Sequence, residues 1–392
     1  MSEDGAGRPW LKLALLVAAT VLGLLGTDLV LPAVPSLPET LGGDSASAQL
    51  VLAAYVGGTS IGLVAFGALG DRFSTRGLIV ASLILTAIVS FACAAAPTVE
   101  ALIALRAVQG AVASGPAVFA PGVVRAMFDE RRAVRALGAL GSIESLAPAL
   151  APILGVWLLS AGGWPLSFEL MGALALALAA INLAFPLVPQ ASRRASGRYL
   201  TLAIDPVYLR YALSQAFVLG GLLVFVFGAP AVLVRSFGGT LTDFIVMQVA
   251  GIATFIASAN VAGSLSARFG AERMIMIGTV LAAAGAGSML AYALAGGSSA
   301  LWVTALFVPV NTGLGLRGPG GFYRAVIAAR GDDARGSALV ILAIMAATAL
   351  GTAAVAPFID RGLVPLALVA LLLQLAALAC LLALPKLDEA NY

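Results

Sequence analysis

Residues 67–76 read GALGDRFSTR, a short charged turn between two stretches of almost wholly apolar sequence. The flanking stretches, 47–70 and 77–96, are each long enough to cross a hydrocarbon layer of about 30 Å as a helix. A tight turn with basic residues between two such helices is typical of a loop on the cytoplasmic face of a membrane. This segment therefore predicts a helical membrane protein.

The composition of the whole chain favours the same class. Of its 392 residues 61% are hydrophobic and only 10% are charged, whereas soluble domains carry about 25% charged residues. Breaks at Pro, Gly and charge clusters delimit twelve candidate spans, which we expect near 11–35, 47–70, 77–96, 99–126, 133–159, 164–186, 207–234, 241–266, 272–294, 299–326, 334–358 and 362–384. We therefore expect an all-α integral membrane protein.

The longest polar connection, residues 190–205, divides the chain near its middle. GALGDRF (67–73) aligns with GSLSARF (263–269) when one half is shifted by about 196 residues, which indicates a weak internal repeat. We expect an N-terminal six-helix bundle over 1–189, a cytoplasmic linker over 190–205 and a C-terminal six-helix bundle over 206–392. Two such halves, related by an axis along the membrane normal, form a known transporter architecture.

The positions of the basic residues predict the orientation. They fall in alternate loops, which places both termini in the cytoplasm: Arg72, Arg76, Arg131, Arg132, Arg135, Arg193, Arg194, Arg198, Arg268, Arg273, Arg324, Arg330 and Arg335. Because they are scattered over many short loops, they do not indicate a nucleic-acid surface. The expected location is the bacterial inner membrane.

Residue usage excludes several kinds of chemistry. The chain has no histidine, its two cysteines lie in apolar spans, and it contains no phosphate-binding Walker loop. We therefore expect no catalytic site, no metal and no cofactor, and an enzyme is the least favoured class. Without imidazole, any transported proton must be carried by a carboxylate.

Asp28, in GTDLVLPAVPSLP (26–38), lies within the first span. A charged side chain at bilayer depth costs roughly 2.5–3.5 kcal/mol, so such a residue is retained where it functions. Burial favours the protonated form, which suits a group that binds and releases a proton. The alternative is an acid near the outer end of the span that is simply solvated.

Three further motifs accompany Asp28. The GALGDR turn, the sequence RAVQG at 106–110 and the Pro and Gly residues of GSIESLAPALAPILG (141–155) all resemble segments of the major facilitator superfamily (MFS). With the LPAVPSLP string after Asp28, the chain looks most like the twelve-span drug/proton antiporters of the bicyclomycin and chloramphenicol resistance branch. Ser74 and Thr75 depart from the pattern, because a Gly-Arg pair is common there.

The resemblance implies roles for matching residues. Asp28 would serve substrate recognition and proton coupling, and Arg106 would influence proton transfer from a neighbouring carboxylate. The turn would act as a conformational latch through Gly67, Asp71, Arg72 and Arg76. The span-5 motif of antiporters is matched by Pro148, Pro152 and Gly155.

Other polar and aromatic residues inside spans are candidates for the substrate site. Glu144 is a second acid that carries protons or contacts substrate, or else faces a loop. Arg317, in NTGLGLRGPGGFYRA (311–325), either lines a cavity and favours an anionic or zwitterionic substrate, or pairs with an acid such as Glu144. The alternative is that it extends to the cytoplasmic interface with Arg324. The remaining candidates are Tyr55, Gln109, Phe119 and Gln215.

These features predict a monomeric exporter that exchanges protons for a small amphiphilic molecule across the bilayer by alternating access. One alternative is a carrier of the same fold for a specific metabolite, such as an amino acid, a siderophore or an organic anion. A second, from another class, is a lipid flippase or a non-transporting membrane protein.

Overall fold

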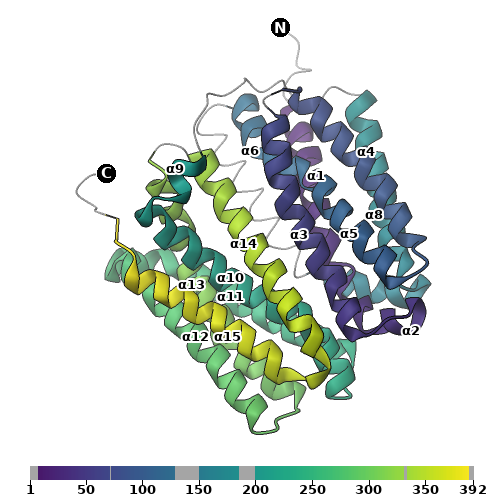
Figure 1. Cartoon of the computed structure of the whole chain (residues 1–392). Helices are drawn as coiled ribbons and strands as arrows, with labels where there is room; N and C mark the ends of the chain where they lie inside the picture. Colours follow the sequence, from purple (N-terminus) through teal and green to yellow (C-terminus); the bar gives the residue numbers. More distant parts are fainter. Residues whose placement is uncertain (1–7, 71, 129–149, 185–198, 331–332, 388–392) are drawn as a thin grey trace. The chain divides into compact units, whose positions relative to one another are not determined.

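The computed structural model describes residues 8–70, 72–128, 150–184, 199–330 and 333–387. Every regular element in these ranges is a helix (Figure 1). In the first part of the chain they are α1 (Arg8–Asp28), η2 (Leu31–Ser36), α2 (Leu37–Leu41), α3 (Ser45–Leu69), α4 (Thr75–Ala94), α5 (Val99–Ala113), α6 (Gly115–Met127), the apolar helix Leu150–Gly162 and α8 (Pro165–Ala184).

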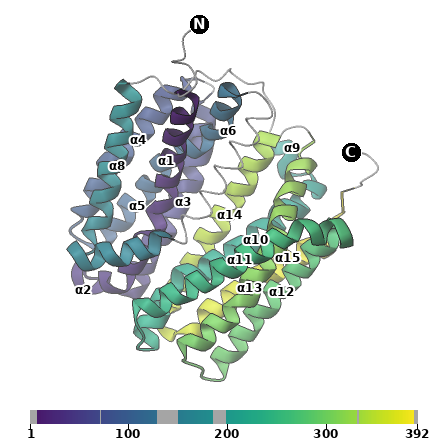
Figure 2. The same cartoon turned by 180° about the vertical axis from the view of Figure 1, so that it is seen from behind.

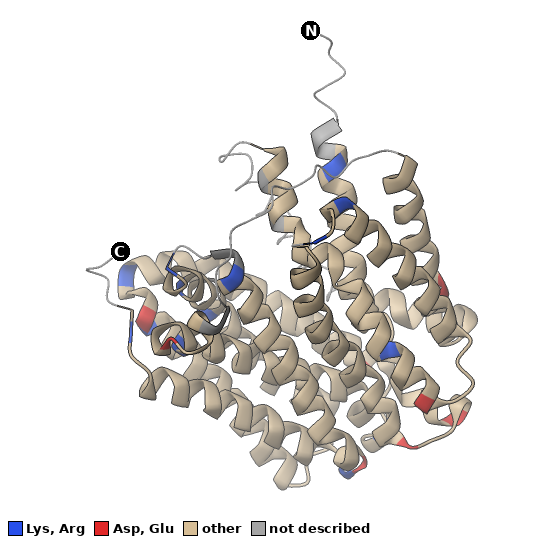
Figure 3. Cartoon of the chain, turned by 45° about the horizontal axis from the view of Figure 1, so that its top comes forward, with Lys and Arg blue, Asp and Glu red and all other residues tan. Residues whose placement is uncertain are grey.

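The second part of the chain is organised in the same way. Its helices are α9 (Tyr199–Ala203), α10 (Pro206–Ala231), the π-helical turn η3 (Val232–Ser236), α11 (Leu241–Phe269), α12 (Ala271–Leu294), α13 (Ala300–Ala328), α14 (Asp333–Val355), η4 (Ala356–Arg361) and α15 (Leu363–Ala383). Figure 3 shows that charged residues lie mostly near helix ends, as expected where helix interiors contact lipid or one another.

Ten described helical segments are long and apolar enough to span a membrane. Two of the twelve predicted spans are not among them. The span predicted over 133–159 falls mostly outside the described residues, where only the helix Leu150–Gly162 is seen. The span predicted over 299–326 corresponds to α13, which is 29 residues long. The prediction of an all-α membrane fold is confirmed.

The first predicted span is not one continuous helix. α1 ends at Asp28 and the chain continues as the 3-10 helix η2, which has Pro32 in its first turn and Pro35 inside it. Proline lacks an N–H donor and clashes with the preceding turn, so α-helical geometry cannot pass through this stretch. Asp28 therefore lies at a helix end rather than in the middle of one.

Polar residues at the predicted loops begin several helices. The Ser74 hydroxyl accepts a hydrogen bond from the Gly77 amide at 3.2 Å, and the Thr98 hydroxyl accepts one from Ala101 at 3.2 Å. Asp205 accepts from the Val207 amide at 2.9 Å at the start of α10. These side chains satisfy amides that have no partner within the helix.

Contacts divide the chain into two compact units, one formed by residues 1–43 and 54–195, the other by residues 44–53 and 196–392. In the first, α4 packs against α5 and α8, and α1 against α6 and α8. In the second, α13 packs against α11 and α12, and α10 against α14 and α15 (Figures 1 and 2).

Glycines allow close helix packing in both units. A Cβ atom on Gly110 of α5 would collide with the Tyr55 carbonyl of α3. Gly278 of α12 and Gly313 of α13 face one another in the same way, because a Cβ atom on either would collide with the carbonyl of the other. Small residues at helix interfaces permit the close approach on which packing in a membrane depends.

Candidate functional site

Arg106 is the centre of a buried polar cluster in the first unit. Its side chain is fully buried on α5. The guanidinium carbon lies 4.1 Å from the centroid of the Tyr55 ring and 5.6 Å from that of Phe168. Arg106 Nη1 donates a 2.7 Å hydrogen bond to Gln109 Oε1, one turn along the same helix. Aromatic faces and an amide oxygen thus stabilise a permanent positive charge inside the bundle.

Gln109 extends this cluster to α4. Its Nε2 atom donates to Ser90 Oγ at 2.7 Å, and Cys93 Sγ lies 3.8 Å from Gln109 Oε1. Ser90, Cys93 and Gln109 are all buried. The amide therefore connects α5 to α4 and orients the oxygen that Arg106 uses.

Asp28 lies near this cluster but is not part of an ion pair with it. Its side chain is 8% exposed, and it makes no hydrogen bond or ion pair with another residue in the described ranges. Tyr55 lies close enough to Asp28 and Arg106 for both charges to act on its phenol group. Its hydroxyl donates to the Gly23 carbonyl at 2.6 Å and packs over Gly26. The Tyr55 ring thus occupies one face of the Arg106 guanidinium.

The described part of the span-5 motif packs against the end of α1. A Cβ atom on Gly155 would lie 2.5 Å from the Leu29 carbonyl oxygen and 3.2 Å from Pro32 Cγ. Pro152, one turn earlier, is buried. The helix Leu150–Gly162 therefore supports the backbone directly after Asp28. Glu144 and Pro148 lie outside the described residues.

The residues of the predicted latch are only partly described. Asp71 lies outside the described residues, and Arg72 is exposed. Arg76 Nη2 donates to the carbonyl oxygens of Asn182 at 3.0 Å and Leu183 at 3.2 Å. Arg76 therefore caps the end of α8, where a positive charge is favourable. Gly67 lies in the last turn of α3.

Phe119 lies away from Arg106. Its ring packs edge-on against Phe66, with 6.3 Å between the ring centroids. The structure thus brings Arg106, Gln109 and Tyr55 together and places Phe119 in an aromatic contact between α6 and α3.

Arg317 forms the corresponding centre in the second unit. The side chain is fully buried on α13. Nη1 donates to Gln215 Oε1 at 3.0 Å and to the Ser214 carbonyl at 3.2 Å, and Nη2 donates to Ser214 Oγ at 3.0 Å. The side chain is therefore directed to α10. The alternative of an extended Arg317 beside Arg324 does not fit this structure, because the side chain is fully buried and both Nη groups bond to α10.

Arg324 belongs to a separate charge cluster that sequence reasoning missed. Glu272 Oε1 lies 3.2 Å from Arg324 Nη1, and Glu272 Oε2 lies 3.1 Å from Nη2 of the buried Arg210. The Tyr211 hydroxyl donates to Glu272 Oε1 at 2.5 Å. These residues come from α10, α12 and α13, and no local motif in the sequence connects them.

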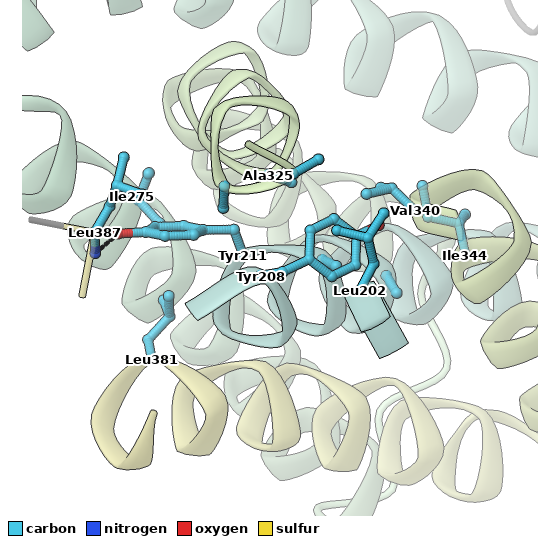
Figure 4. Close-up of a cluster of buried hydrophobic side chains, with 13 residues drawn as sticks. Leu202, Tyr208, Tyr211, Ile275, Ala325, Val340, Ile344, Leu381 and Leu387 are labelled. Atoms are coloured by element: carbon cyan, nitrogen blue, oxygen red, sulfur yellow. Dashed lines mark hydrogen bonds between the residues drawn. The ribbon is translucent and has the colours of Figure 1, made fainter. Parts of the chain in front are cut away.

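The same cluster attaches the end of the chain to the bundle. Arg210 donates to the carbonyl oxygens of Leu381 and Leu384. The Leu387 amide donates to the Tyr211 hydroxyl at 3.0 Å, which is the dashed line in Figure 4. Figure 4 also shows Tyr208 and Tyr211 among apolar side chains of the surrounding helices. The cluster therefore stabilises the arrangement of α10, α12, α13 and α15.

Comparison with known proteins identifies the family. The family model of the Major Facilitator Superfamily matches residues 16–338. The chain belongs to this superfamily. The MFS chain is thus a multi-pass membrane transporter and not an enzyme.

Several relatives indicate the branch of the superfamily to which this MFS chain is most similar. It is 27% identical over 324 residues to the uncharacterized MFS-type transporter YdgK of Bacillus subtilis, with 80% of each chain covered. It is 28% identical to a chloramphenicol resistance protein of Pseudomonas aeruginosa, covering 69% of this chain and 67% of the relative. A bicyclomycin resistance protein homolog of Haemophilus influenzae is 24% identical, with 66% and 67% covered. The predicted resemblance to this branch is confirmed.

A solved structure confirms the fold. A bacterial homolog of the human lysosomal transporter Spinster, in an inward-facing and unoccupied conformation, superposes with a TM-score of 0.72 at 14% identity. The match covers 96% of this chain and 95% of that chain.

Proposed function

We propose that this MFS transporter exports a small amphiphilic molecule, such as an antibiotic, in exchange for protons. The observation that carries the proposal is Asp28, a buried carboxylate without an ion-pair partner among the described residues. A charged carboxylate is costly in such a place and a protonated one is not, so its protonation state responds to solvent access. The names of the chloramphenicol and bicyclomycin resistance relatives support export.

The cluster around Arg106 supplies the second part of the proposed mechanism. Arg106 is permanently charged, and its guanidinium lies over the ring of Tyr55, whose hydroxyl packs over Gly26, two residues before Asp28. In this mechanism the Arg106 charge favours the deprotonated form of Asp28 and assists proton release. Proton binding to Asp28 then accompanies substrate release, and the two halves alternate around one site. We further propose that the protein is a monomer in the inner membrane, with both termini in the cytoplasm.

The test is substrate-dependent proton movement in proteoliposomes that contain an internal pH dye. Wild type, Asp28→Asn and Glu169→Gln are compared with a panel of cationic, neutral and anionic compounds. Glu169 is the matched control, because it is an exposed acid on α8 of the same unit. We expect compound-dependent signals from wild type and Glu169→Gln, and none from Asp28→Asn. An equal response from Asp28→Asn contradicts the role of Asp28 and transfers it to Glu144.

Arg317 favours a second candidate function, a carrier for one specific metabolite. A buried guanidinium is suited to one kind of polar group rather than to many chemically different drugs. Growth inhibition with and without expression of the chain separates the two functions. Resistance to several unrelated compounds supports a multidrug exporter, whereas a response to a single class supports the metabolite carrier.

A further inference from the structure

The buried charge of Arg317 is paired only with neutral acceptors in the described part of the second unit. Its three hydrogen bonds go to the Ser214 carbonyl, the Ser214 hydroxyl and the Gln215 amide oxygen. Its Nε atom is buried and has no hydrogen-bond partner among the described residues. Arginine stays protonated, and a buried positive charge is stabilised best by an anion. The site therefore has an unused donor and an unmatched charge.

One acid of this unit, Glu272 on α12, already has partners of its own. Glu272 bonds to Arg210, Tyr211 and Arg324. Arg324 lies seven residues beyond Arg317 on α13, which corresponds to about 10 Å along a helix axis. Glu272 therefore compensates the positive charges of Arg210 and Arg324, and not the charge of Arg317.

A glycine leaves room beside the guanidinium of Arg317. A Cβ atom on Gly321 would lie 2.8 Å from Gln215 Oε1 and 3.3 Å from Arg317 Nη2, so a side chain there would crowd this pair. Glycine at this position permits close approach of a bound group.

We propose that Arg317, with Gln215 and Ser214, binds a carboxylate group of the transported molecule. This inference rests on the proposed function and names its substrate class, an amphiphile that carries one carboxylate as an anion or a zwitterion. The carboxylate receives one hydrogen bond from the free Nε–H and one from an Nη–H group, the forked geometry in which arginine binds carboxylates. A single guanidinium matches the single charge of a carboxylate better than the higher charge of a phosphate.

The test measures binding to the full chain in nanodiscs by calorimetry, with pairs of compounds that differ in one carboxylate. The pairs are chloramphenicol hemisuccinate with its methyl ester, and N-acetylciprofloxacin with its methyl ester. We expect wild type to bind the acid of at least one pair about tenfold more tightly than its neutral partner, the value of one charge-assisted hydrogen bond. Arg317→Gln abolishes this preference, while Arg317→Lys keeps part of it.

Arg268→Gln is the matched control, because Arg268 is an exposed arginine of the same unit. Its preference should equal that of wild type, and the melting temperature of each variant shows whether it is folded. Equal binding of acid and neutral compound by wild type, a preference that survives in Arg317→Gln, or no binding of any compound overturns the inference.

The same protein in proteoliposomes separates this inference from the proposed function. Proton-coupled transport without a carboxylate preference overturns the inference and leaves the function. A carboxylate preference that depends on Arg317, without proton-coupled transport, overturns the proposed function and leaves the binding site.

Discussion

Arg106 and Arg317 are both fully buried guanidinium groups that bond to a glutamine, yet the two units hold them differently. Arg106 lies against the faces of Tyr55 and Phe168 and bonds to Gln109 on its own helix. Arg317 has only hydrogen bonds to α10, and its Nε atom has no partner in the described ranges. The first arginine is held mainly by aromatic rings, whereas the second is held by hydrogen bonds to oxygen atoms of a neighbouring helix.

The difference shows two ways in which an apolar helix bundle can stabilise the positive charge of a guanidinium group. Cation–π contacts stabilise a guanidinium without a mobile counter-ion and fix its orientation. Hydrogen bonds to neutral oxygens orient a guanidinium but leave its charge available. We therefore associate Arg106 with proton coupling and Arg317 with selection of the substrate.

Replacing each arginine by leucine should give the largest difference in stability loss between the two units. Arg106→Leu removes two ring contacts and leaves Gln109 Oε1 with only the weak Cys93 S–H donor, so we expect a loss of about 2–4 kcal/mol in the free energy of unfolding. Arg317→Leu removes a poorly compensated charge and should change stability by less than about 1 kcal/mol. Denaturation of the purified variants in detergent measures both values, and equal losses would contradict the comparison.

Replacing Gly155 by alanine should disturb the packing of the helix Leu150–Gly162 against the backbone directly after Asp28. The added Cβ would lie 2.5 Å from the Leu29 carbonyl oxygen, so Gly155→Ala should cost about 1–3 kcal/mol through overpacking. Gly263→Ala in the second unit is the control, since a Cβ there meets nothing within 4 Å. The control should be neutral or slightly stabilising because alanine favours a helix. A melting temperature equal to wild type for Gly155→Ala would show that the helix can shift without cost.

Tyr55 contributes to stability through a hydrogen bond and through a ring contact, and substitutions can separate the two. Tyr55→Phe removes the hydrogen bond to the Gly23 carbonyl and keeps the ring on Arg106, so a loss of about 0.5–1.5 kcal/mol is expected. Tyr55→Leu also removes the ring contact and should lose about 0.5–2 kcal/mol more. Ser214→Ala, which removes one acceptor of Arg317, should cost less than Tyr55→Leu. The free energy of unfolding of the three variants ranks them, and a reversed order would contradict the assignment.

The smallest effect is expected at Asp44, which caps α3. Its carboxylate accepts hydrogen bonds from the Ser47 hydroxyl at 2.7 Å and the Ser47 amide at 2.8 Å, which lower the pKa of Asp44 below the ordinary value of 3.8. A lowered pKa means that the stabilisation is complete above this value and is lost as the pH falls through the folded-state pKa. Asp44→Asn keeps a capping oxygen and does not titrate.

Melting temperatures of wild type and Asp44→Asn between pH 7 and pH 3 check this expectation. A small advantage of wild type should stay constant above about pH 4 and disappear at lower pH. An advantage that grows on acidification would mean that Asp44 acts through other contacts.

Local features of the sequence determined most of the fold. Runs of apolar residues and the charged turns between them indicate where helices begin and end, because burial in a membrane and helix capping act over neighbouring residues. The Arg106–Gln109 contact is of the same kind, since residues three apart lie on one helix face. The break after Asp28 also follows from two prolines in the sequence.

Only the tertiary structure decided which distant groups meet. Gln215 is 102 residues from Arg317, and Glu272 is 62 residues from Arg210, so no spacing in the sequence predicts either contact. Tyr55 lies on Arg106 because α3 and α5 approach closely at Gly110, which is a result of packing. A buried charged side chain on a helix can contact any of several neighbouring helices, and the packing of the bundle determines which helix it contacts. The sequence by itself determined the membrane fold and the buried charges, while the tertiary structure determined what each charge contacts.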